Sequence, residues 1–286
     1  MVDMKKETVV ITGATGFVAR NLRKFLSQKH YQIISISRRD FKIFQNEKKI
    51  ITQNLKDKKI LNNVKNADVL FHLVGLGKQS VNSDFFTTNI EITSEIISIC
   101  KSSKIKKIVF LSGLGVSKNS EISYFISKYI AEKSIIDSKL NYTIFRPSYI
   151  VGKDDYLTKF LKKQSRNNQM VIPGSGNYLI QPISVCDVVQ VLEKSFHEKK
   201  FDKKIIDLVG PEKISYQKYV KIMAKKLNSK VSKMNIEKLL ENSIRNNSDF
   251  GIDDIVLLFG NFTGNHHKLR NISGINFRKI SELNSC

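Results

Sequence analysis

A tyrosine and a lysine four residues apart form the candidate catalytic pair of this chain. Tyr124 and Lys128 lie in the segment YFISK, which we predict to be helical, so both side chains lie on one face. A phenol has a pKa of about 10 and is a poor acid or base at neutral pH. A neighbouring ammonium lowers that pKa and lets the tyrosine exchange a proton with a substrate hydroxyl or carbonyl. A tyrosine and a lysine at this spacing are also common by chance, so the position of the pair in the fold must show whether it is functional.

A glycine-rich loop near the start of the chain is the candidate phosphate site. The segment ITGATGFVARNL follows a short apolar run and precedes a helical pattern, which is the context of a dinucleotide-binding loop. Gly13 permits a tight turn, Gly16 allows the backbone to approach a pyrophosphate, and Ala19 occupies the third position, which tolerates alanine. The helix that follows directs its free N–H groups at the phosphates. The cofactor-binding residues predicted here are Gly13, Thr15, Gly16, Phe17 and Val18.

The end of the second predicted strand should select between the two nicotinamide cofactors. An NAD site commonly has an acidic residue at this point, whereas an arginine accommodates the 2′-phosphate of NADP. In this chain Arg38 and Arg39 come first and Asp40 follows. We therefore expect NADP(H) to be preferred, with Arg38 as the selecting residue and NAD(H) as the alternative. The structural alternative is that both arginines are solvated at a strand end.

Strands and helices alternate through the first half of the chain. We predict strands over 7–12, 31–37, 48–54, 67–75, 106–113 and 141–148, with helices at 17–29, 57–64, 84–103 and 123–137. Such alternation gives right-handed crossovers and a parallel sheet. The sequence thus predicts an α/β protein with a Rossmann-type doubly wound parallel sheet.

The alternation loosens after residue 150. Short strands mix with helices near 155–168, 186–198 and 215–227. We predict an NAD(P)-binding domain at 1–150 and a smaller C-terminal α/β substrate-binding region at 151–286, interleaved with the end of the sheet. Open α/β sheets bind ligands at the carboxyl ends of their strands, so this region should cover that edge.

The composition restricts the partners. Among 286 residues, 48 Lys and Arg face 26 Asp and Glu, a net charge of +22. The cations are scattered and no aromatic residues alternate with them, so we expect a lysine-rich surface and no nucleic-acid partner. A small, anionic substrate suits this charge. No apolar run reaches the ~20 residues of a transmembrane helix, and no signal-peptide pattern is found, so a cytoplasmic location is expected.

No metal site is predicted. The three cysteines are widely separated, and the neighbouring His266 and His267 have no third ligand nearby in the sequence. Asp154 and Asp155 are typical of a helix N-cap. The turn at 172–177, IPGSGN, is either an ordinary glycine turn or a contact for a nucleotide-sugar diphosphate.

These motifs together resemble the short-chain dehydrogenase/reductase superfamily, in its extended or atypical epimerase/dehydratase form. The resemblance runs nearly end to end through TGATGFVA, HLVG, FLSGLGV, YFISK, RPSYIVG and PISVCDVV. Within the superfamily, SGLGV and DLVGPEKISYQKYV are most similar to the branch of the dehydrogenase-like accessory subunit of respiratory complex I. That branch would allow peripheral association with a membrane complex.

The resemblance also implies further site residues. The turn after the fourth strand should pack against the adenosine half of the cofactor, and QNLKD stands where relatives have Asp-Leu beside the adenine. Lys128 should also hold the nicotinamide ribose, and the segment after the sixth strand should lead to the nicotinamide. The cofactor-binding residues implied in this way are Asn54, Leu55, Leu73, Val74, Gly75, Lys128 and Pro147.

One position departs from the family pattern. Relatives carry a serine or threonine after the fifth strand that completes a triad with the tyrosine and lysine. Alignment through Val116 puts Gly113 at this place, with Ser112 one residue earlier. A shift of one residue on a strand turns a side chain to the other face, so Ser112 is a doubtful catalytic residue.

Two functions follow from these residues. The first is an oxidoreductase or a sugar-nucleotide epimerase/dehydratase that uses Tyr124 and Lys128. The second is an NADP(H)-binding scaffold or assembly factor in which little substrate is turned over. The retained Tyr–Lys pair favours the first, towards which we lean, and Gly113 favours the second.

Overall fold

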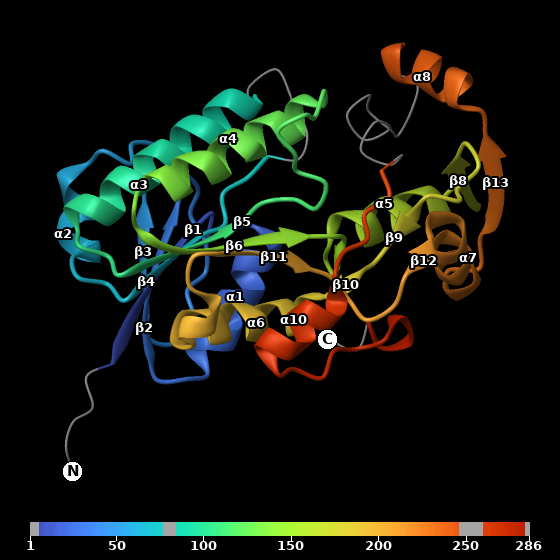
Figure 1. Ribbon diagram of the computed structural model, residues 1–286. Helices are drawn as coiled ribbons and strands as arrows, with labels where there is room; N and C mark the ends of the chain where they lie inside the picture. The colour runs from blue at the N-terminus through green and yellow to red at the C-terminus, as the bar shows by residue number, and fades with distance from the viewer. Residues whose placement is uncertain (1–5, 77–83, 246–259, 284–286) are drawn as a thin grey trace.

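Seven parallel strands form the centre of the protein; the alternation of strands and helices predicts six of them, and the seventh comes from the region after residue 150. The computed structural model describes residues 6–76, 84–245 and 260–283. The strands lie in the order β3-β2-β1-β4-β5-β6-β11, and all neighbouring strands are parallel (Figure 1). They are β1 (Glu7–Thr12), β2 (Tyr31–Ser37), β3 (Glu47–Ile51), β4 (Val69–His72), β5 (Lys107–Leu111), β6 (Asn141–Pro147) and β11 (Lys204–Leu208). The Rossmann-type α/β fold is confirmed.

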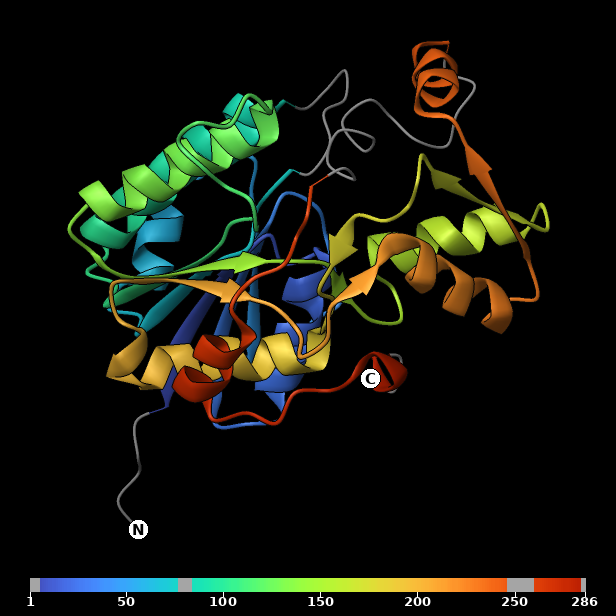
Figure 2. The ribbon, with the colours of Figure 1, turned by 45° about the vertical axis from the view of Figure 1, so that its right-hand side comes forward.

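Helices cover both faces of this sheet (Figure 2). One face is covered by α1 (Phe17–Ser27), α6 (Val185–His197) and α10 (His266–Ser273), and the other by α2 (Lys58–Val64), α3 (Ile92–Ser102) and α4 (Ser123–Asp137). Alternate residues of β1 serve the two layers: Val9 and Ile11 belong to the core under α1 and α6, and Val10 to the core under α3. A strand that is buried on both faces has a continuous run of apolar residues, and this run is what predicts β1 from the sequence.

A smaller lobe extends from the carboxyl edge of the sheet (Figure 2). It has its own core, which includes Leu161, Ile172, Tyr216 and Val220. Its elements are β7 (Ile150–Val151), α5 (Tyr156–Ser165), β8 (Gln169–Pro173), β9 (Leu179–Ile180), β10 (Ile183–Ser184), β12 (Ile214–Ser215), α7 (Tyr216–Lys226), β13 (Lys230–Met234) and α8 (Ile236–Ile244). Asp155 caps α5 by accepting a hydrogen bond from the Thr158 N–H at 2.8 Å, which confirms it as a helix N-cap.

The chain after residue 150 contributes to both parts of the protein. It builds the lobe and also returns to the sheet through α6, β11 and α10, with short 3₁₀ turns η2 (Lys199–Phe201) and η3 (Ile280–Glu282). The division at residue 150 therefore stays a prediction about domains. None of the helices in the described ranges is long and apolar enough to cross a bilayer.

Among the predicted elements whose bounds differ from those observed, two lie next to the cavity described below. The strand expected over 67–75 ends at His72, because Leu73 to Gly75 leave the sheet at its carboxyl edge. The helix expected over 84–103 begins with a π-helical turn, η1 (Phe86–Glu91), before α3. Apolar periodicity does not distinguish a π turn from an α turn, and π turns occur frequently at functional sites.

Candidate functional site

A cavity of about 360 Å³ lies where the carboxyl ends of β1, β2 and β4 meet. This is the edge at which open α/β sheets bind their ligands, and the volume is within the ~300–1,000 Å³ range of ligand sites. The cavity is lined by Thr12, Gly13, Thr15, Gly16, Ile36, Ser37, Arg38, Arg39, Thr52, Gln53, Leu55, Leu73, Val74, Gly75, Leu76, Thr88, Ile92 and Glu95.

The glycine-rich loop forms one wall of this cavity. Gly13 has φ +71°, and a Cβ atom there would lie 2.9 Å from the backbone of Leu73 and Val74, so only glycine fits. Gly16 is the N-cap residue of α1, and the first turn of this helix contains no acidic residue. Ala19 is 1% exposed and packs in the core beneath the loop, as expected for the third position. The loop therefore presents a helix N-terminus to the cavity without a competing carboxylate.

Arginines line the cavity at the end of β2, and the nearby carboxylate does not. The side chain of Asp40 accepts a hydrogen bond from Lys49 Nζ at 2.6 Å, and this contact lowers the pKa of the carboxyl group. Gln53 Nε2 donates to the carbonyl of Arg38 at 3.2 Å and fixes the backbone there. Arg38 and Arg39 are thus the charged groups that the end of β2 offers to a ligand.

The structure brings most of the predicted cofactor-binding residues to this cavity. Those that line it are Gly13, Thr15, Gly16, Arg38, Leu55, Leu73, Val74 and Gly75. Five do not line it, of which Lys128 and Pro147 are described below. Val18 packs against the core, and the Phe17 ring lies beside Gly152. Asn54 accepts a hydrogen bond from the Lys56 N–H at 2.9 Å in a local turn, and Gln53 lines the cavity instead.

Sequence reasoning did not identify the residues that η1 and α3 contribute to the cavity. Thr88, Ile92 and Glu95 lie on one face of the continuous helical segment, four and then three residues apart. That spacing is visible in the sequence, but only the packing of the helix against the sheet shows which face is turned to the cavity.

Lys128 lies next to Gly75, which lines the same cavity. It is 3% exposed, its Nζ donates to the Leu111 carbonyl at 3.3 Å, and it lies 2.8 Å from where a Cβ atom on Gly75 would be. Burial lowers the pKa of the Lys128 ammonium to about 8, against the opposing charge of Glu132. Lys128 therefore meets the wall of the larger cavity at Gly75, on the same helix as Tyr124.

Tyr124 opens onto a second, smaller cavity of about 180 Å³. The walls of this cavity are Gly113, Leu114, Tyr124, Phe125, Pro147, Ser148, Tyr149 and Phe262, which includes the predicted cofactor residue Pro147. Burial raises the pKa of Tyr124 to about 12. The expected lowering by Lys128 is therefore not found, because desolvation is the dominant influence on the phenol.

Gly113 stands where the family resemblance leads us to expect a serine or threonine. A Cβ atom built on Gly113 would lie 3.0 Å from the Tyr124 hydroxyl oxygen, so a side chain at this position would lie against that hydroxyl. Ser112 is 5% exposed, and its Oγ has no hydrogen-bond partner in the described part of the chain. The structure thus places Ser112 beside the site without a contact to Tyr124.

Asn89, in the π turn, holds the loop after β4 to α4. Its Oδ1 accepts from the Leu76 N–H at 3.0 Å, and its Nδ2 donates to the Oγ of Ser127, next to Lys128 in the chain, at 3.0 Å.

The remaining sequence candidates lie elsewhere. His266 contacts the Val209 carbonyl through Nδ1 at 3.0 Å, and the turn at 172–177 lines neither cavity.

Comparison with known proteins identifies the family. Residues 9–205 match the NAD dependent epimerase/dehydratase family. This chain belongs to that family. The match begins in β1 and extends into β11, so it covers the glycine-rich loop, the Tyr–Lys pair and most of the sheet.

Curated family relatives include subunits of respiratory complex I. NADH dehydrogenase (ubiquinone) 1 alpha subcomplex subunit 9, mitochondrial, of Dictyostelium discoideum is 24% identical over 82% of this chain and 71% of its own length. The NADH-ubiquinone oxidoreductase 40 kDa subunit, mitochondrial, of Neurospora crassa is 22% identical over 72% of this chain and 56% of its own length. The chain thus spans only part of these relatives.

Solved structures of the same fold include sugar-nucleotide enzymes. MoeE5 in complex with UDP-glucuronic acid and NAD superimposes with a TM-score of 0.77 at 17% identity, covering 96% of this chain and 95% of MoeE5. Epimerase Mth375 of Methanothermobacter thermautotrophicus gives a TM-score of 0.79 at 15% identity, covering 97% and 90%. At such identities these similarities concern the fold.

Proposed function

We propose that this chain binds NADP(H) in preference to NAD(H) and acts as an oxidoreductase on a small substrate held beside Tyr124. One observation carries the proposal: the cavity lined by the glycine-rich loop and Arg38 approaches, at Gly75 and Lys128, the smaller cavity that contains Tyr124. A nicotinamide cofactor fits the first cavity. Gly13 has no side chain and packs closely against the backbone of the turn after β4, so no side chain at this position blocks phosphates from the loop.

In this proposal the residues of the larger cavity bind the cofactor, and Tyr124 in the smaller cavity acts on the substrate. Arg38 binds the 2′-phosphate, and the N-terminus of α1 binds the pyrophosphate. Lys128 orients the ribose, and Tyr124 exchanges a proton between its hydroxyl and a substrate oxygen. The bound nicotinamide supplies hydride exchange with the substrate carbon.

The smaller cavity favours a substrate with apolar groups next to the reacting carbon. Four of its eight lining residues are large apolar or aromatic side chains besides Tyr124, namely Leu114, Phe125, Tyr149 and Phe262. Among the described residues, no Lys, Arg, Asp, Glu or His lines it. This composition supports an oxidoreductase acting on an apolar alcohol or carbonyl over the sugar-nucleotide epimerases or dehydratases among the relatives, while the basic surface allows an anionic group outside the cavity.

A second candidate is an NADP(H)-binding scaffold, and the Gly113 position favours it. Loss of one donor to a developing oxyanion typically costs ~10²–10³ in rate. A cofactor present at 100 times its Kd stabilises a fold by ~2.7 kcal/mol without turnover. The complex I subunits among the relatives support peripheral attachment to a membrane complex as the setting for such a scaffold. The cytoplasmic location stays a prediction, since those relatives are mitochondrial.

Calorimetric titration followed by a turnover assay tests both candidates. We expect NADPH to bind more tightly than NADH, and NADPH oxidation at 340 nm to accelerate with members of a panel of aryl and alkyl ketones. UDP-glucuronic acid serves as the sugar-nucleotide comparison. Binding without turnover on any substrate would support the scaffold, and absence of binding by either cofactor would contradict the proposal.

A further inference from the structure

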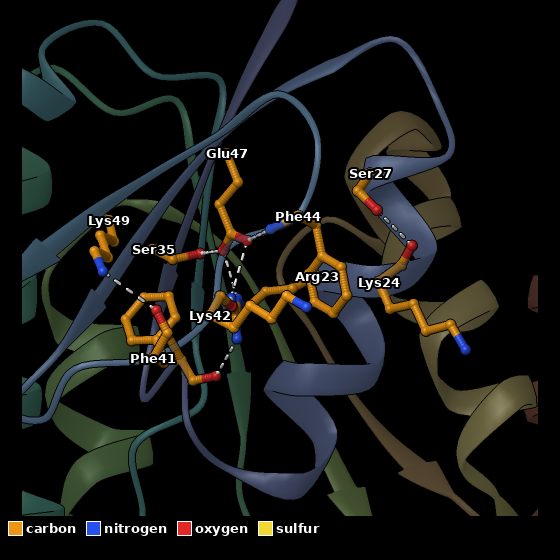
Figure 3. Close-up of polar contacts among 10 residues, drawn as sticks. Arg23, Lys24, Ser27, Ser35, Phe41, Lys42, Phe44, Glu47 and Lys49 are labelled. Carbon is orange, nitrogen blue, oxygen red and sulfur yellow. Dashed lines mark hydrogen bonds and ion pairs between the residues drawn. The ribbon is translucent and has the colours of Figure 1, made fainter.

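Arg23 is a buried cation that contacts three separate segments of the chain. It lies on α1 and is 2% exposed. Its Nη1 donates to the carbonyl of Ala14 at 3.0 Å, and its Nη2 donates to the carbonyl of Lys42 at 2.8 Å. Nε and Nη2 also bind the two carboxylate oxygens of Glu47, the latter at 2.9 Å (Figure 3). One guanidinium therefore joins α1, the glycine-rich loop and the β2–β3 connection.

Glu47 is the matching buried anion at the start of β3. Its side chain is fully buried, and besides Arg23 it accepts hydrogen bonds from the Ser35 hydroxyl of β2 and from the Phe44 N–H at 2.8 Å (Figure 3). The rings of Phe41 and Phe44 lie 4.2 and 5.2 Å from the guanidinium carbon. Both charges are thus buried and hydrogen-bonded, and two aromatic rings contact the guanidinium.

Stability alone does not account for this pair. Replacing a buried ion pair with apolar side chains of similar volume is often neutral or stabilising, because both charges must be desolvated. Apolar side chains have no donors, however, so they cannot hold the Ala14 and Lys42 carbonyls in fixed directions. What the pair adds to an apolar core is therefore the orientation of two backbone segments.

Both segments belong to the walls of the larger cavity. Ala14 lies inside the glycine-rich loop of residues 13–16, and its N–H donates to the Ile36 carbonyl of β2 at 3.2 Å. Lys42 lies in the β2–β3 connection, which begins with Arg38 and Arg39 at the end of β2. The phosphate end and the ribose end of the cavity are therefore joined behind the lining.

We propose that Arg23 and Glu47 are a positioning pair that fixes the phosphate loop relative to Arg38 and thereby sets both the affinity for NADP(H) and the preference over NAD(H). The proposal rests on the proposed cofactor function. Neither side chain lines the cavity, so the pair acts through the backbone it holds. Lysine at position 23 would keep the charge but cannot place donors in three fixed directions at once.

The test is the double variant Arg23→Met/Glu47→Met, which removes both charges together and avoids an unpaired buried ion. The matched control is Lys107→Met/Asp202→Met, which removes the pair formed by a buried lysine at the opposite, amino-terminal end of β5. We expect NADPH to bind about 10-fold or more weakly to the double variant, equivalent to losing one charge-assisted hydrogen bond, and its preference over NADH to fall. The control should bind like wild type, and thermal unfolding should show both variants to be folded.

Amide hydrogen exchange of the free protein supplies a measurement that does not depend on the cofactor. In the double variant, exchange should accelerate together at residues 13–16 and 40–44 and stay unchanged in the control. Unchanged exchange in these segments, unchanged NADPH affinity, or wild-type affinity in Arg23→Lys would overturn the positioning role. If wild type binds neither cofactor, the proposed function fails, and the exchange result still decides whether the pair holds the two segments together.

Discussion

The two cavities at the carboxyl edge of the sheet are built in different ways. The larger one is formed mainly by backbone and by side chains that are close in sequence, such as those of the glycine-rich loop and the end of β2. The smaller one depends on side chains from α4, β6 and Phe262. It has a glycine, Gly113, where a serine or threonine would place a hydroxyl next to Tyr124. Because backbone geometry survives most substitutions while a catalytic donor depends on one side chain, binding is the more robust property of this chain.

The largest effect should come from Gly13→Ala, which tests the backbone-built cavity. A β-carbon at φ +71° and 2.9 Å from the β4 turn adds strain and overlap of about 2–4 kcal/mol. We expect cofactor binding to be abolished in calorimetry and the free energy of unfolding to fall by that amount. Gly274→Ala is the matched control, because it also places a side chain at a positive φ, +61°, but outside the cavity, where its Cβ would meet only Lys194 Nζ, at 3.8 Å. Wild-type affinity in Gly13→Ala would contradict the site.

Tyr124→Phe tests the side-chain-built cavity. Removing the hydroxyl should lower turnover by ~10²–10⁴ while leaving cofactor affinity unchanged, because the ring packing against Phe85 and Phe125 is retained. Steady-state rates and calorimetry on the same protein separate the two properties. Tyr149→Phe, in the wall of the same cavity, is the control. Full activity in Tyr124→Phe would remove the tyrosine from the mechanism.

Gly113→Ser should sharpen the contrast by restoring the missing donor. Its Cβ would lie 3.0 Å from the Tyr124 hydroxyl oxygen, so a shift of a few tenths of an ångström, roughly, brings the new hydroxyl into the site. We expect turnover to rise by about 10² if this donor limits the rate. Gly113→Ala adds the same carbon without the hydroxyl, and equal rates in the two variants would show that the missing donor is not limiting.

Arg38→Ala tests cofactor selection. Loss of a charge-assisted contact with the 2′-phosphate should weaken NADPH binding by about 10- to 100-fold and leave NADH binding unchanged. Arg20→Ala, on the exposed side of α1 outside the cavity, controls for the change in net charge. Equal losses for both cofactors, or a preference for NADH in wild type, would refute the assignment to Arg38.

The smallest effect concerns the pH dependence of Lys128. Burial lowers its pKa to about 8, below the unfolded value of about 10.5, so the unfolded chain binds more protons between these pH values. Wild-type stability should therefore rise relative to Lys128→Met by about 1 kcal/mol per pH unit between pH 8 and 10. Denaturant unfolding at pH 7, 8.5 and 9.5 measures this difference, and parallel curves would show that Lys128 is not desolvated.

The cofactor cavity was largely predictable because its residues follow one another at strand ends. The order strand–Gly13–Gly16–helix and the run Arg38–Arg39 fix both walls within 40 residues of one another, with backbone contacts that any sequence of this pattern makes. Gln53 lines the cavity and the predicted Asn54 does not, because a local turn engages the Asn54 amide and periodicity does not predict turns of this kind. Thr88, Ile92 and Glu95 could not be assigned to the cavity, because the sequence does not show which face of their helix is turned towards the sheet.

The sequence by itself determined the parallel α/β order, the glycine-rich loop between the first strand and helix, the placement of Tyr124 and Lys128 on one helical face and the glycine at position 113. Tertiary structure alone decided the electrostatics of that pair and the linkage behind the loop. Burial raises the pKa of Tyr124 and lowers that of Lys128, because desolvation depends on packing against residues distant in the sequence, such as Phe85 beside Tyr124 and Phe110 beside Lys128. The contact of Arg23 with Glu47 likewise joins residues 24 positions apart, and only packing brings them together.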